Sequence, residues 1–283
     1  MSDLFDFKPQ AIAYAVMGNP ISHSKSPQIH SAFARQFELD IEYSRIQVDP
    51  GGFEQAVSHF FAHGGGGLNI TLPFKVEAWQ LCQRGNNALS SRAISAQAVN
   101  TLAVTEPGSL RGDNTDGVGL VRDLADNCGV DLAGKRVLVV GAGGAVRGVL
   151  EPLLSQEPAT LTLVNRTFSR AESLAEAFES NISALALNHV PETPYDVVIN
   201  GTAASLEHEL PGIARECVGT DTAVYDMMYG SEPTLFMTWA LGLGAATAHD
   251  GLGMLVEQAA ESFAIWHGKR PETRPVIAQL RKI

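Results

Sequence analysis

The chain has 283 residues, 45% hydrophobic and 18% charged, so it can bury the core of one large or two medium domains rather than remain disordered. The formal net charge of −11 argues against a nucleic-acid surface, although a local cationic site for a small anion remains compatible with it. The N-terminal segment has no signal-peptide pattern, and the longest apolar stretch, 235–248, is too short to span a membrane. Cys82, Cys128 and Cys217 form no metal or disulfide pattern, which favours reduced thiols in the cytoplasm.

Strand and helix patterns alternate along the first half of the chain, which is typical of an α/β fold. A buried strand is predicted at 11–18, and a helix at 27–37 follows a serine-rich loop. In that loop Ser26 is placed to cap the helix and Pro27 to begin it. The next expected elements are a strand at 42–48, a helix from Phe53, a glycine-rich turn with a short strand at 63–75, and strands at 99–104 and 110–114 around a turn at 106–109.

A second α/β pattern occupies the rest of the chain. The expected elements are helices at 114–128, 145–156 and 252–267, and strands at 135–140, 160–165, 196–200 and 223–227. Valine and leucine dominate the strand at 135–140, as expected for a strand buried in a parallel sheet. Two compact α/β domains with parallel sheets therefore fit the sequence better than one.

A glycine-rich turn follows the strand at 135–140 and precedes a helix. Gly141, Gly143 and Gly144 would let the backbone approach a pyrophosphate, and the helix N-terminus would supply unpaired N–H groups. Val146 stands where the GxGxxG pattern has its third glycine. The alternative is a tight turn without a ligand, so this motif alone does not decide the function.

The strand that follows ends without an acid. NAD-binding folds usually place Asp or Glu there for the ribose hydroxyls, whereas this chain has Arg166 and Arg170 in the segment NRTFSR. Guanidinium groups can pair with a 2′-phosphate that a carboxylate would repel. The pattern therefore favours NADP over NAD, unless both arginines are only solvated surface charges.

Polar side chains recur near the ends of the predicted strands in the first half. They are Asn69, Thr71, Lys75, Asn100, Thr101 and the segment 113–116, although Asn100 and Thr101 open their predicted strand. Each could be an ordinary surface or turn residue in isolation. Together they suggest carbonyl reduction, because hydride transfer to a ketone leaves an alkoxide that a lysine ammonium beside a carboxylate can protonate.

The ordered motifs make the chain recognisable. It resembles the shikimate dehydrogenase family over nearly its whole length. The motifs that carry the resemblance are GNPISHSKSP (18–27), NITLPFK (69–75), AVNTL (98–102), GDNTDGVG (112–119), GAGGA (141–145), NRTFSR (165–170), YDMMY (225–229) and DGLGMLVEQA (250–259).

The resemblance implies an NADP-dependent, reversible reduction of 3-dehydroshikimate to shikimate in the pathway to chorismate and the aromatic amino acids. It implies a substrate domain built from both chain ends, 1–115 and 251–283, and a Rossmann-like NADP domain at 116–250, with a cleft between them. It implies that Lys75 and Asp116 are the catalytic pair, with Lys75 as the acid and base. The substrate would be a small molecule, with no nucleic acid, membrane or metal, and the protein would be a cytoplasmic monomer or homodimer.

The same resemblance implies the remaining site residues. Those expected to bind substrate, besides the catalytic pair, are Ser22, Ser24, Thr71, Asn100, Tyr229 and Gln258. Those expected to line the cofactor are Gly141, Ala142, Gly143, Gly144, Ala145, Asn165, Arg166, Thr167, Phe168, Ser169, Arg170, Thr202, Met227 and Gly251. Thr202 comes from a looser match at 200–206, and the segment 76–97 is longer than expected for the family.

The serine pair is also supported by spacing. In an extended segment residues two apart point the same way, so Ser22 and Ser24 could present two hydroxyls to one carboxylate. Ser26 would then serve the helix instead.

Two alternatives remain open at the level of function. A close relative could oxidise quinate, or both quinate and shikimate, often with NAD, but the arginine pattern and the paired serines argue against this. A regulatory protein that binds NADP without turnover would be expected to lose Lys75 or Asp116, and this chain keeps both.

Overall fold

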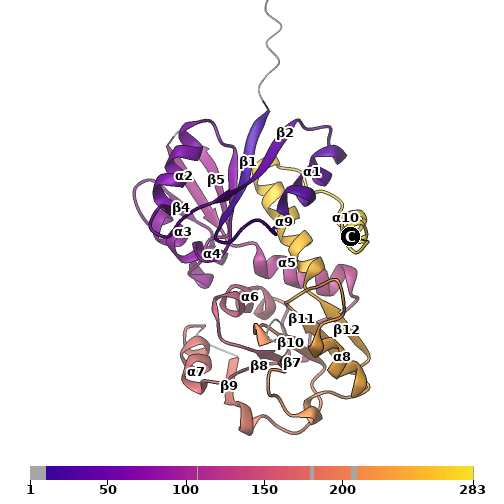
Figure 1. Ribbon diagram of the computed structural model, residues 1–283. Helices are drawn as coiled ribbons and strands as arrows, with labels where there is room; N and C mark the ends of the chain where they lie inside the picture. Colours follow the sequence, from indigo (N-terminus) through magenta and orange to yellow (C-terminus); the bar gives the residue numbers. More distant parts are fainter. Residues whose placement is uncertain (1–10, 107, 179–181, 205–208, 283) are drawn as a thin grey trace, which may run out of the picture.

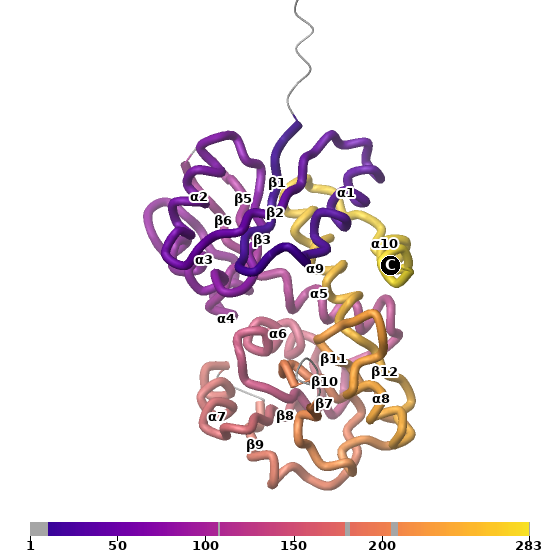
Figure 2. The backbone as a smooth tube through the Cα atoms, viewed as in Figure 1, coloured from indigo at the N-terminus to yellow at the C-terminus, as the bar shows by residue number. Residues whose placement is uncertain are grey.

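The computed structural model describes residues 11–106, 108–178, 182–204 and 209–282. These residues form two halves, each built on a six-stranded sheet with helices packed beside it (Figure 1). Helices α5 (Asp116–Arg122) and α9 (Leu252–His267) run between the two halves. Figure 2 shows the C-terminal segment, in yellow, returning to the half that holds the beginning of the chain.

The first sheet has the order β2-β1-β3-β5-β6-β4 and is mixed. Its strands are β1 (Ile12–Gly18), β2 (Ile41–Gln47), β3 (Gly67–Ile70), β4 (Ala88–Leu89), β5 (Thr101–Glu106) and β6 (Ser109–Asp113). Strand β1 is parallel to β2 and β3, but β5 is antiparallel to both β3 and β6. The prediction of parallel sheets is therefore wrong for the pairings of β5, and β5 and β6 follow one another too closely for a parallel crossover.

The second sheet is wholly parallel, as predicted, with the order β12-β11-β10-β7-β8-β9. Its strands are β7 (Arg136–Val140), β8 (Thr160–Asn165), β9 (Ile182–Ala186), β10 (Val197–Asn200), β11 (Ala223–Asp226) and β12 (Thr247–Asp250). The order runs outward in both directions from β7 and β10, so a topological switch point lies between these strands. This is the doubly wound arrangement in which ligands bind beyond the carboxyl ends of the strands.

Helices cover the sheets and link them. Those of the first half are α1 (Ser26–Gln36), α2 (Phe53–Ala62), α3 (Lys75–Cys82), α4 (Ser91–Ala96) and the C-terminal α10 (Arg274–Leu280). Those of the second half are α6 (Gly144–Leu154), α7 (Phe168–Glu176) and α8 (Leu235–Gly242), with short 3-10 turns at Leu187–His189 and Arg215–Cys217. A π-helical turn, Asp123–Asn127, continues α5.

The central strand β7 lies in the middle of the core of the second half. Residues Val137–Val140 are at most 1% exposed, and they pack into two apolar clusters, one on each face of the sheet. A strand covered on both faces needs apolar side chains at every position, which is the pattern that the sequence shows.

Glycines on α5 allow the linking helices to approach closely. A Cβ added at Gly119 would lie 2.8 Å from the backbone nitrogen of Gln258 and 2.9 Å from the carbonyl oxygen of Met254, both on α9. A Cβ at Gly117 would lie 2.6 Å from the carbonyl oxygen of Gly148 on α6. The start of α5 therefore packs directly against the first half of α9, between the two sheets.

The antiparallel pairing also places polar residues from β3 and β5 at one edge. Asn69 near the end of β3 pairs with Thr101 at the start of β5, and the backbone N–H of Ile70 donates to the carbonyl of Asn100 at 2.8 Å. Asn100 lies directly before β5 and is still at the edge where β3 ends, because the two strands run in opposite directions. Among the described helices none is long and apolar enough to cross a membrane.

Candidate active site

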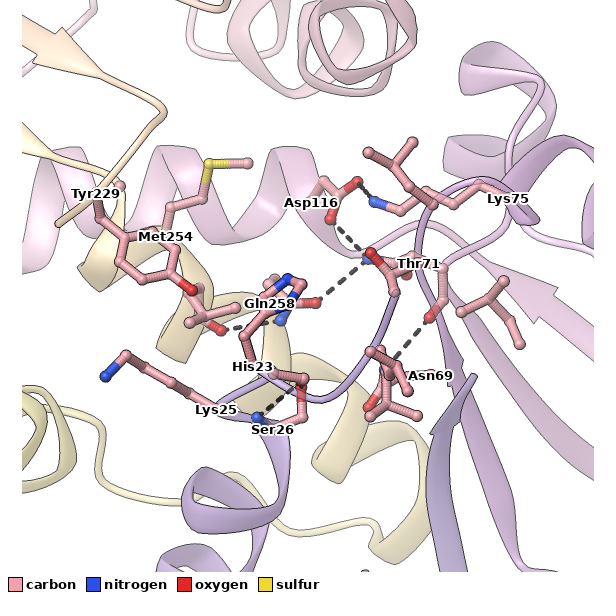
Figure 3. Close-up of a pocket in the computed structure, with 18 of the residues that line it drawn as sticks. His23, Lys25, Ser26, Asn69, Thr71, Lys75, Asp116, Tyr229, Met254 and Gln258 are labelled. Atoms are coloured by element: carbon pink, nitrogen blue, oxygen red, sulfur yellow. Dashed lines mark hydrogen bonds and ion pairs between the residues drawn. The ribbon is translucent and has the colours of Figure 1, made fainter. Parts of the chain in front are cut away.

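A cavity of about 410 Å³ lies between the two halves (Figure 3). The first half contributes the loop after β1, the segment from β3 to α3 and the start of β5, and the second half contributes the loop after β11. The predicted residues that line the cavity are Ser24, Thr71, Lys75, Asn100, Asp116, Met227, Tyr229, Gly251 and Gln258. The eight motifs lie far apart in the sequence, and most of the residues predicted to bind substrate line this one cavity.

The ion pair of Lys75 and Asp116 lies at one side of this cavity. Nζ of Lys75 donates to Oδ2 of Asp116 at 2.6 Å, and the two side chains are 25% and 14% exposed. Each residue is the first of its helix, α3 and α5 respectively. The pair is partly shielded from water but still open to the cavity, so an ammonium and a carboxylate face the same small space.

Asn100 fixes the carboxylate of this pair. Its Nδ2 donates to Oδ1 of Asp116 at 2.8 Å and to Oγ1 of Thr115 at 2.9 Å, and its Oδ1 accepts from the backbone N–H of Thr115. The same amide lies 3.3 Å from Oε1 of Gln258 on α9. One buried amide therefore connects the carboxylate of Asp116 to both the first sheet and the linking helix.

The serine loop differs from the prediction. Residues 22–23 form a turn, with the backbone N–H of Ser24 donating to the carbonyl of Ile21 at 3.0 Å, so the segment is not extended. Ser22 is exposed and does not line the cavity, whereas Ser24 and Ser26 both do. Their hydroxyl oxygens are 3.1 Å apart. The alternation argument that paired Ser22 with Ser24 was wrong, because it holds only for extended backbone.

The predicted capping role of Ser26 was wrong as well. Helix α1 begins at Ser26 itself, the preceding position is Lys25, and no side chain caps the helix there. Ser26 is 7% exposed, and its backbone N–H lies 3.3 Å from the hydroxyl of Ser24. The guanidinium of Arg45 on β2 donates to the carbonyl of Ser24 at 2.9 Å and holds the loop against the sheet.

Tyr229 and Gln258 close the cavity from the other side. Burial, aided by the charge of Asp250, raises the pKa of Tyr229, and its hydroxyl, which is protonated at neutral pH in an ordinary tyrosine too, is a hydrogen-bond donor there. Nε2 of Gln258 donates to the carbonyl of Leu255 at 2.9 Å, which turns its Oε1 toward Asn100 and Thr115.

The glycine turn lies beside a second cavity of about 380 Å³. Gly141 has φ of +115°, a conformation that suits glycine, and a Cβ at Gly143 or Gly144 would meet nothing within 4 Å. This open space at the first turn of α6 fits a pyrophosphate. Val146 is fully buried, and Gly201 provides the room it needs, since a Cβ there would lie 2.3 Å from Val146 Cγ2.

The other predicted cofactor residues divide into two groups. Ala142, Gly143, Gly144, Ser169 and Arg170 line the second cavity, while Met227 and Gly251 line the first. Ala145, Arg166, Thr167 and Phe168 are exposed near the start of α6 or α7, and Nδ2 of Asn165 donates to the carbonyl of Thr167. Oγ1 of Thr202 donates to Oδ1 of Asn200 at 2.7 Å, which ties it to its own turn.

Sequence reasoning did not place Ser26 in the first cavity or Arg147 in the second. Arg147 lines the second cavity and also donates through Nε to the carbonyl of Ser95 at 3.0 Å, bridging α6 and α4. Its position one helical turn after the glycines could have identified it. The described residues contain no group of three histidine, cysteine or acidic side chains placed to hold a metal.

Three family models match the chain in order. They are the shikimate dehydrogenase substrate binding domain at 16–102, shikimate / quinate 5-dehydrogenase at 123–210, and the shikimate 5′-dehydrogenase C-terminal domain at 251–281. The shikimate dehydrogenase (NADP(+)) of Marinobacter nauticus is 54% identical over 272 residues, which cover 95% of this chain and 98% of that protein. That of Alkalilimnicola ehrlichii is 56% identical over 270 residues, with the same shares covered. The chain belongs to the shikimate dehydrogenase family.

Solved structures agree with this family and its fold. The shikimate 5-dehydrogenase of Thermus thermophilus, in complex with NADP(H) and shikimate, is 29% identical with a TM-score of 0.85 over 96% of this chain and 99% of that one. An Ael1 enzyme from Pseudomonas putida is 41% identical with a TM-score of 0.90 over 95% and 98% of the two chains. The predicted resemblance to the shikimate dehydrogenase family and the predicted α/β fold class are confirmed.

Proposed function

We propose that the chain catalyses the reversible NADPH-dependent reduction of 3-dehydroshikimate to shikimate. The observation that carries the proposal is the ion pair of Lys75 and Asp116, 2.6 Å apart, in a cavity lined by both halves of a shikimate dehydrogenase family member. In this arrangement a bound carbonyl and the cofactor can meet beside an ammonium group. The relatives with more than half of their residues identical carry the same activity and cofactor in their names.

The proton is supplied by Lys75. Bound NADPH would supply the hydride for the carbonyl carbon, and the carbonyl oxygen would then need a proton. The Lys75 ammonium gives that oxygen a proton, so the product is a neutral hydroxyl and the lysine is left as an amine that regains a proton from solvent. In the reverse direction the amine takes the proton from the hydroxyl. Asp116, held by Asn100, orients both the lysine and the substrate hydroxyl.

The other residues that line the first cavity are proposed to bind the substrate. Ser24 and Ser26 present neighbouring hydroxyls to the substrate carboxylate, and Tyr229 reaches the same group from the opposite side. Thr71, Asn100 and Gln258 hold ring hydroxyls. The proposed substrate domain is 1–115 together with 251–283, and the proposed NADP domain is 116–250.

The second cavity is proposed to hold the remote end of NADP. Gly143 and Gly144 leave open space for the pyrophosphate at the N-terminus of α6, and Arg170 brings a guanidinium to the same cavity. Arg166, exposed on the adjacent loop, is the second candidate for the 2′-phosphate. Three cysteines that are free thiols support the cytoplasm as the compartment.

One spectrophotometric assay tests the proposal against its alternatives. Initial rates of cofactor reduction are measured with shikimate or quinate, each with NADP or NAD. We expect the fastest turnover with shikimate and NADP. Faster turnover with quinate and NAD would replace the proposal with a quinate dehydrogenase, and cofactor binding without turnover on either substrate would replace it with a regulatory protein.

A further inference from the structure

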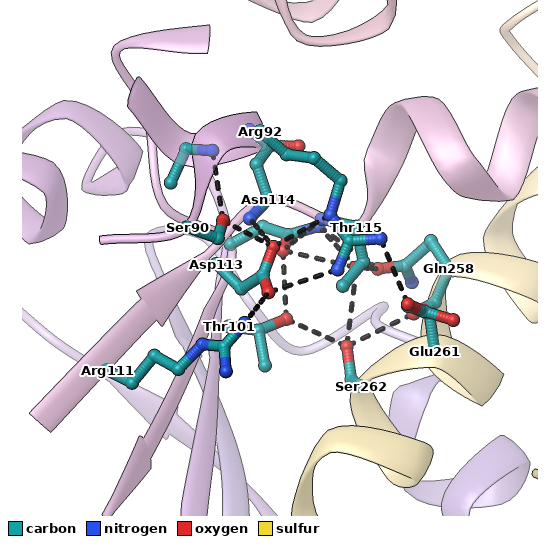
Figure 4. A network of polar contacts seen from close by, with 12 residues as sticks. Ser90, Arg92, Thr101, Arg111, Asp113, Asn114, Thr115, Gln258, Glu261 and Ser262 are labelled. Atoms are coloured by element: carbon teal, nitrogen blue, oxygen red, sulfur yellow. Dashed lines mark hydrogen bonds and ion pairs between the residues drawn. The ribbon is translucent and has the colours of Figure 1, made fainter. Parts of the chain in front are cut away.

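A polar network lies behind the active-site cavity, around the buried carboxylate of Asp113 (Figure 4). The side chain of Asp113 is 1% exposed. Its Oδ1 accepts from the hydroxyl of Ser90 at 2.7 Å and from Nε of Arg92 at 3.0 Å, and its Oδ2 accepts from Nη2 of Arg92 at 3.0 Å. Arg92 therefore binds this carboxylate with two parallel hydrogen bonds, the arrangement that gives the most defined geometry.

The network continues along the backbone to the ion pair. Asp113 ends β6, and its Oδ1 also accepts from the backbone N–H of Asn114 at 2.7 Å. Oδ1 of Asn114 accepts in turn from the backbone N–H of Asp116 at 3.1 Å, while its Nδ2 donates to the carbonyl of Ala98. The turn that carries Asp116 is thus fixed by two successive side chains, and the first of these is held by Arg92.

The same guanidinium also reaches the linking helix. Nη1 of Arg92 donates to Oε1 of Glu261 on α9 at 2.9 Å, and the other oxygen of Glu261 is bound by Arg122. Glu261 lies three residues after Gln258, on the same face of α9. A single side chain therefore connects the segment that carries Asp116 with the helix that carries Gln258.

None of Arg92, Asp113 and Glu261 lines the active-site cavity. We propose that Arg92 is a positioning residue, whose guanidinium holds Asp113 and Glu261 together and thereby sets where Asp116 and Gln258 stand in the cavity. The inference rests on the proposed function, because it assigns Arg92 to the chemistry of that cavity. A residue that only stabilised the fold would leave the turnover of the folded enzyme unchanged.

The test compares Arg92→Ala with Arg111→Ala. Arg111 also approaches Asp113, at 3.6 Å, but its side chain is 49% exposed, and within the described part of the chain it forms no ion pair with Glu261. For Arg92→Ala we expect kcat for shikimate oxidation to fall by about 10²-fold, as for a misplaced catalytic group, with KM for NADP unchanged. Arg111→Ala should keep the kcat of the wild type. Thermal unfolding of each variant is followed in parallel.

Chemical rescue separates positioning from folding. Arg92 lines a further cavity of about 600 Å³ on the other side of the network, and its side chain is 21% exposed, so a small cation can enter the space that Arg92→Ala leaves. Guanidinium chloride at a concentration below that which denatures should restore part of the lost kcat. Methylammonium and sodium chloride at the same ionic strength should not, since neither ion can bind two carboxylates with parallel N–H groups.

The outcomes separate this inference from the proposed function. Wild-type protein without shikimate-dependent NADP reduction would overturn both. An active wild type with an equally active Arg92→Ala, or a loss of kcat that guanidinium fails to restore, would overturn the positioning role alone. Should Arg92→Ala not fold, Arg92→Lys keeps the charge but lacks the fork that binds Asp113 while reaching Glu261, and wild-type kcat in that variant would equally overturn it.

Discussion

In the proposed reaction one side chain, Lys75, carries the proton. Lys75→Ala removes the ammonium while leaving the second cavity intact, so kcat should fall by about 10²- to 10⁴-fold and NADP binding should persist. Steady-state kinetics with shikimate and a fluorescence titration with NADPH measure the two effects. A change confined to KM for shikimate would instead make Lys75 a binding residue.

The corrected serine pair provides a second prediction at the same scale, with a control built into the loop. Ser26→Ala removes a hydroxyl that lines the cavity, whereas Ser22→Ala removes one that is exposed outside it. Loss of a hydrogen bond to a charged group should raise KM for shikimate by about tenfold or more in Ser26→Ala. Ser22→Ala should keep the wild-type KM for shikimate. A larger rise of KM in Ser22→Ala than in Ser26→Ala would instead favour the predicted pair of Ser22 and Ser24.

Single residues also show where sequence reasoning stops. Ser22, Ser24 and Ser26 have the same side chain, and only the turn at 22–23 decides which two of them line the cavity. Lys75 and Asp116 were predictable as chemical types, but their 2.6 Å contact depends on how α3 and α5 begin. The sequence did not indicate a functional role for Arg92, because an arginine in a short helix is most often a surface charge.

Among the elements, the predictable ones are those with a strong apolar pattern. The strand β7 and helix α9 were predicted nearly at their observed bounds, since both bury most of their side chains. Strand β12 was missed, because its four residues, Thr247–Asp250, are mostly polar and follow a glycine-rich stretch. The antiparallel pairing of β5 depends on long-range contacts that no local pattern contains.

The packing of α5 against α9 yields a prediction with a matched glycine. Gly119→Ala places a Cβ 2.8 Å from the backbone of Gln258, which cannot move aside without shifting α9, so the free energy of unfolding should fall by about 1–3 kcal/mol. Gly148→Ala, inside α6, meets nothing closer than 3.5 Å and should stabilise by about 0.5–1 kcal/mol. Urea denaturation compares them, and equal destabilisation of both would contradict the close approach.

The start of α7 gives the prediction for cofactor choice. Arg170 lines the second cavity, whereas Arg166 is exposed on the loop before the helix. Arg170→Ala should raise KM for NADP by about tenfold and leave KM for NAD unchanged, because only NADP has the 2′-phosphate. Arg166→Ala measured beside it shows how the two arginines share the phosphate. Equal effects on both cofactors would refute the assignment.

At the scale of the whole molecule, stability should depend on pH through His30. This histidine is fully buried, with its ring stacked on Tyr43 at 4.3 Å between centroids. Burial lowers the pKa of His30 from 6.5 to about 3, while the nearby polar side chain of Asn69 opposes this shift and the charge of His267 adds to it. The folded protein therefore holds His30 neutral at pH values where the unfolded chain binds a proton.

The sign follows from which state binds more protons. Between the folded and unfolded pKa values the unfolded chain binds the extra proton, so the free energy of unfolding falls as the pH falls below the unfolded value. From about pH 7 to about pH 5 the loss due to His30 should be about 2 kcal/mol. Burial also lowers the pKa values of His249 and His267, so these two histidines contribute a pH dependence of the same sign as that of His30.

His30→Phe isolates this contribution, because phenylalanine keeps an aromatic ring against Tyr43 and cannot bind a proton. Urea denaturation at both pH values should show that the variant loses about 2 kcal/mol less than the wild type on acidification. His63→Phe, at an exposed position on the surface, is the control and should keep the full pH dependence of the wild type. An unchanged slope in His30→Phe would mean that other groups cause the acid sensitivity, and that His30 takes up its proton without unfolding the chain.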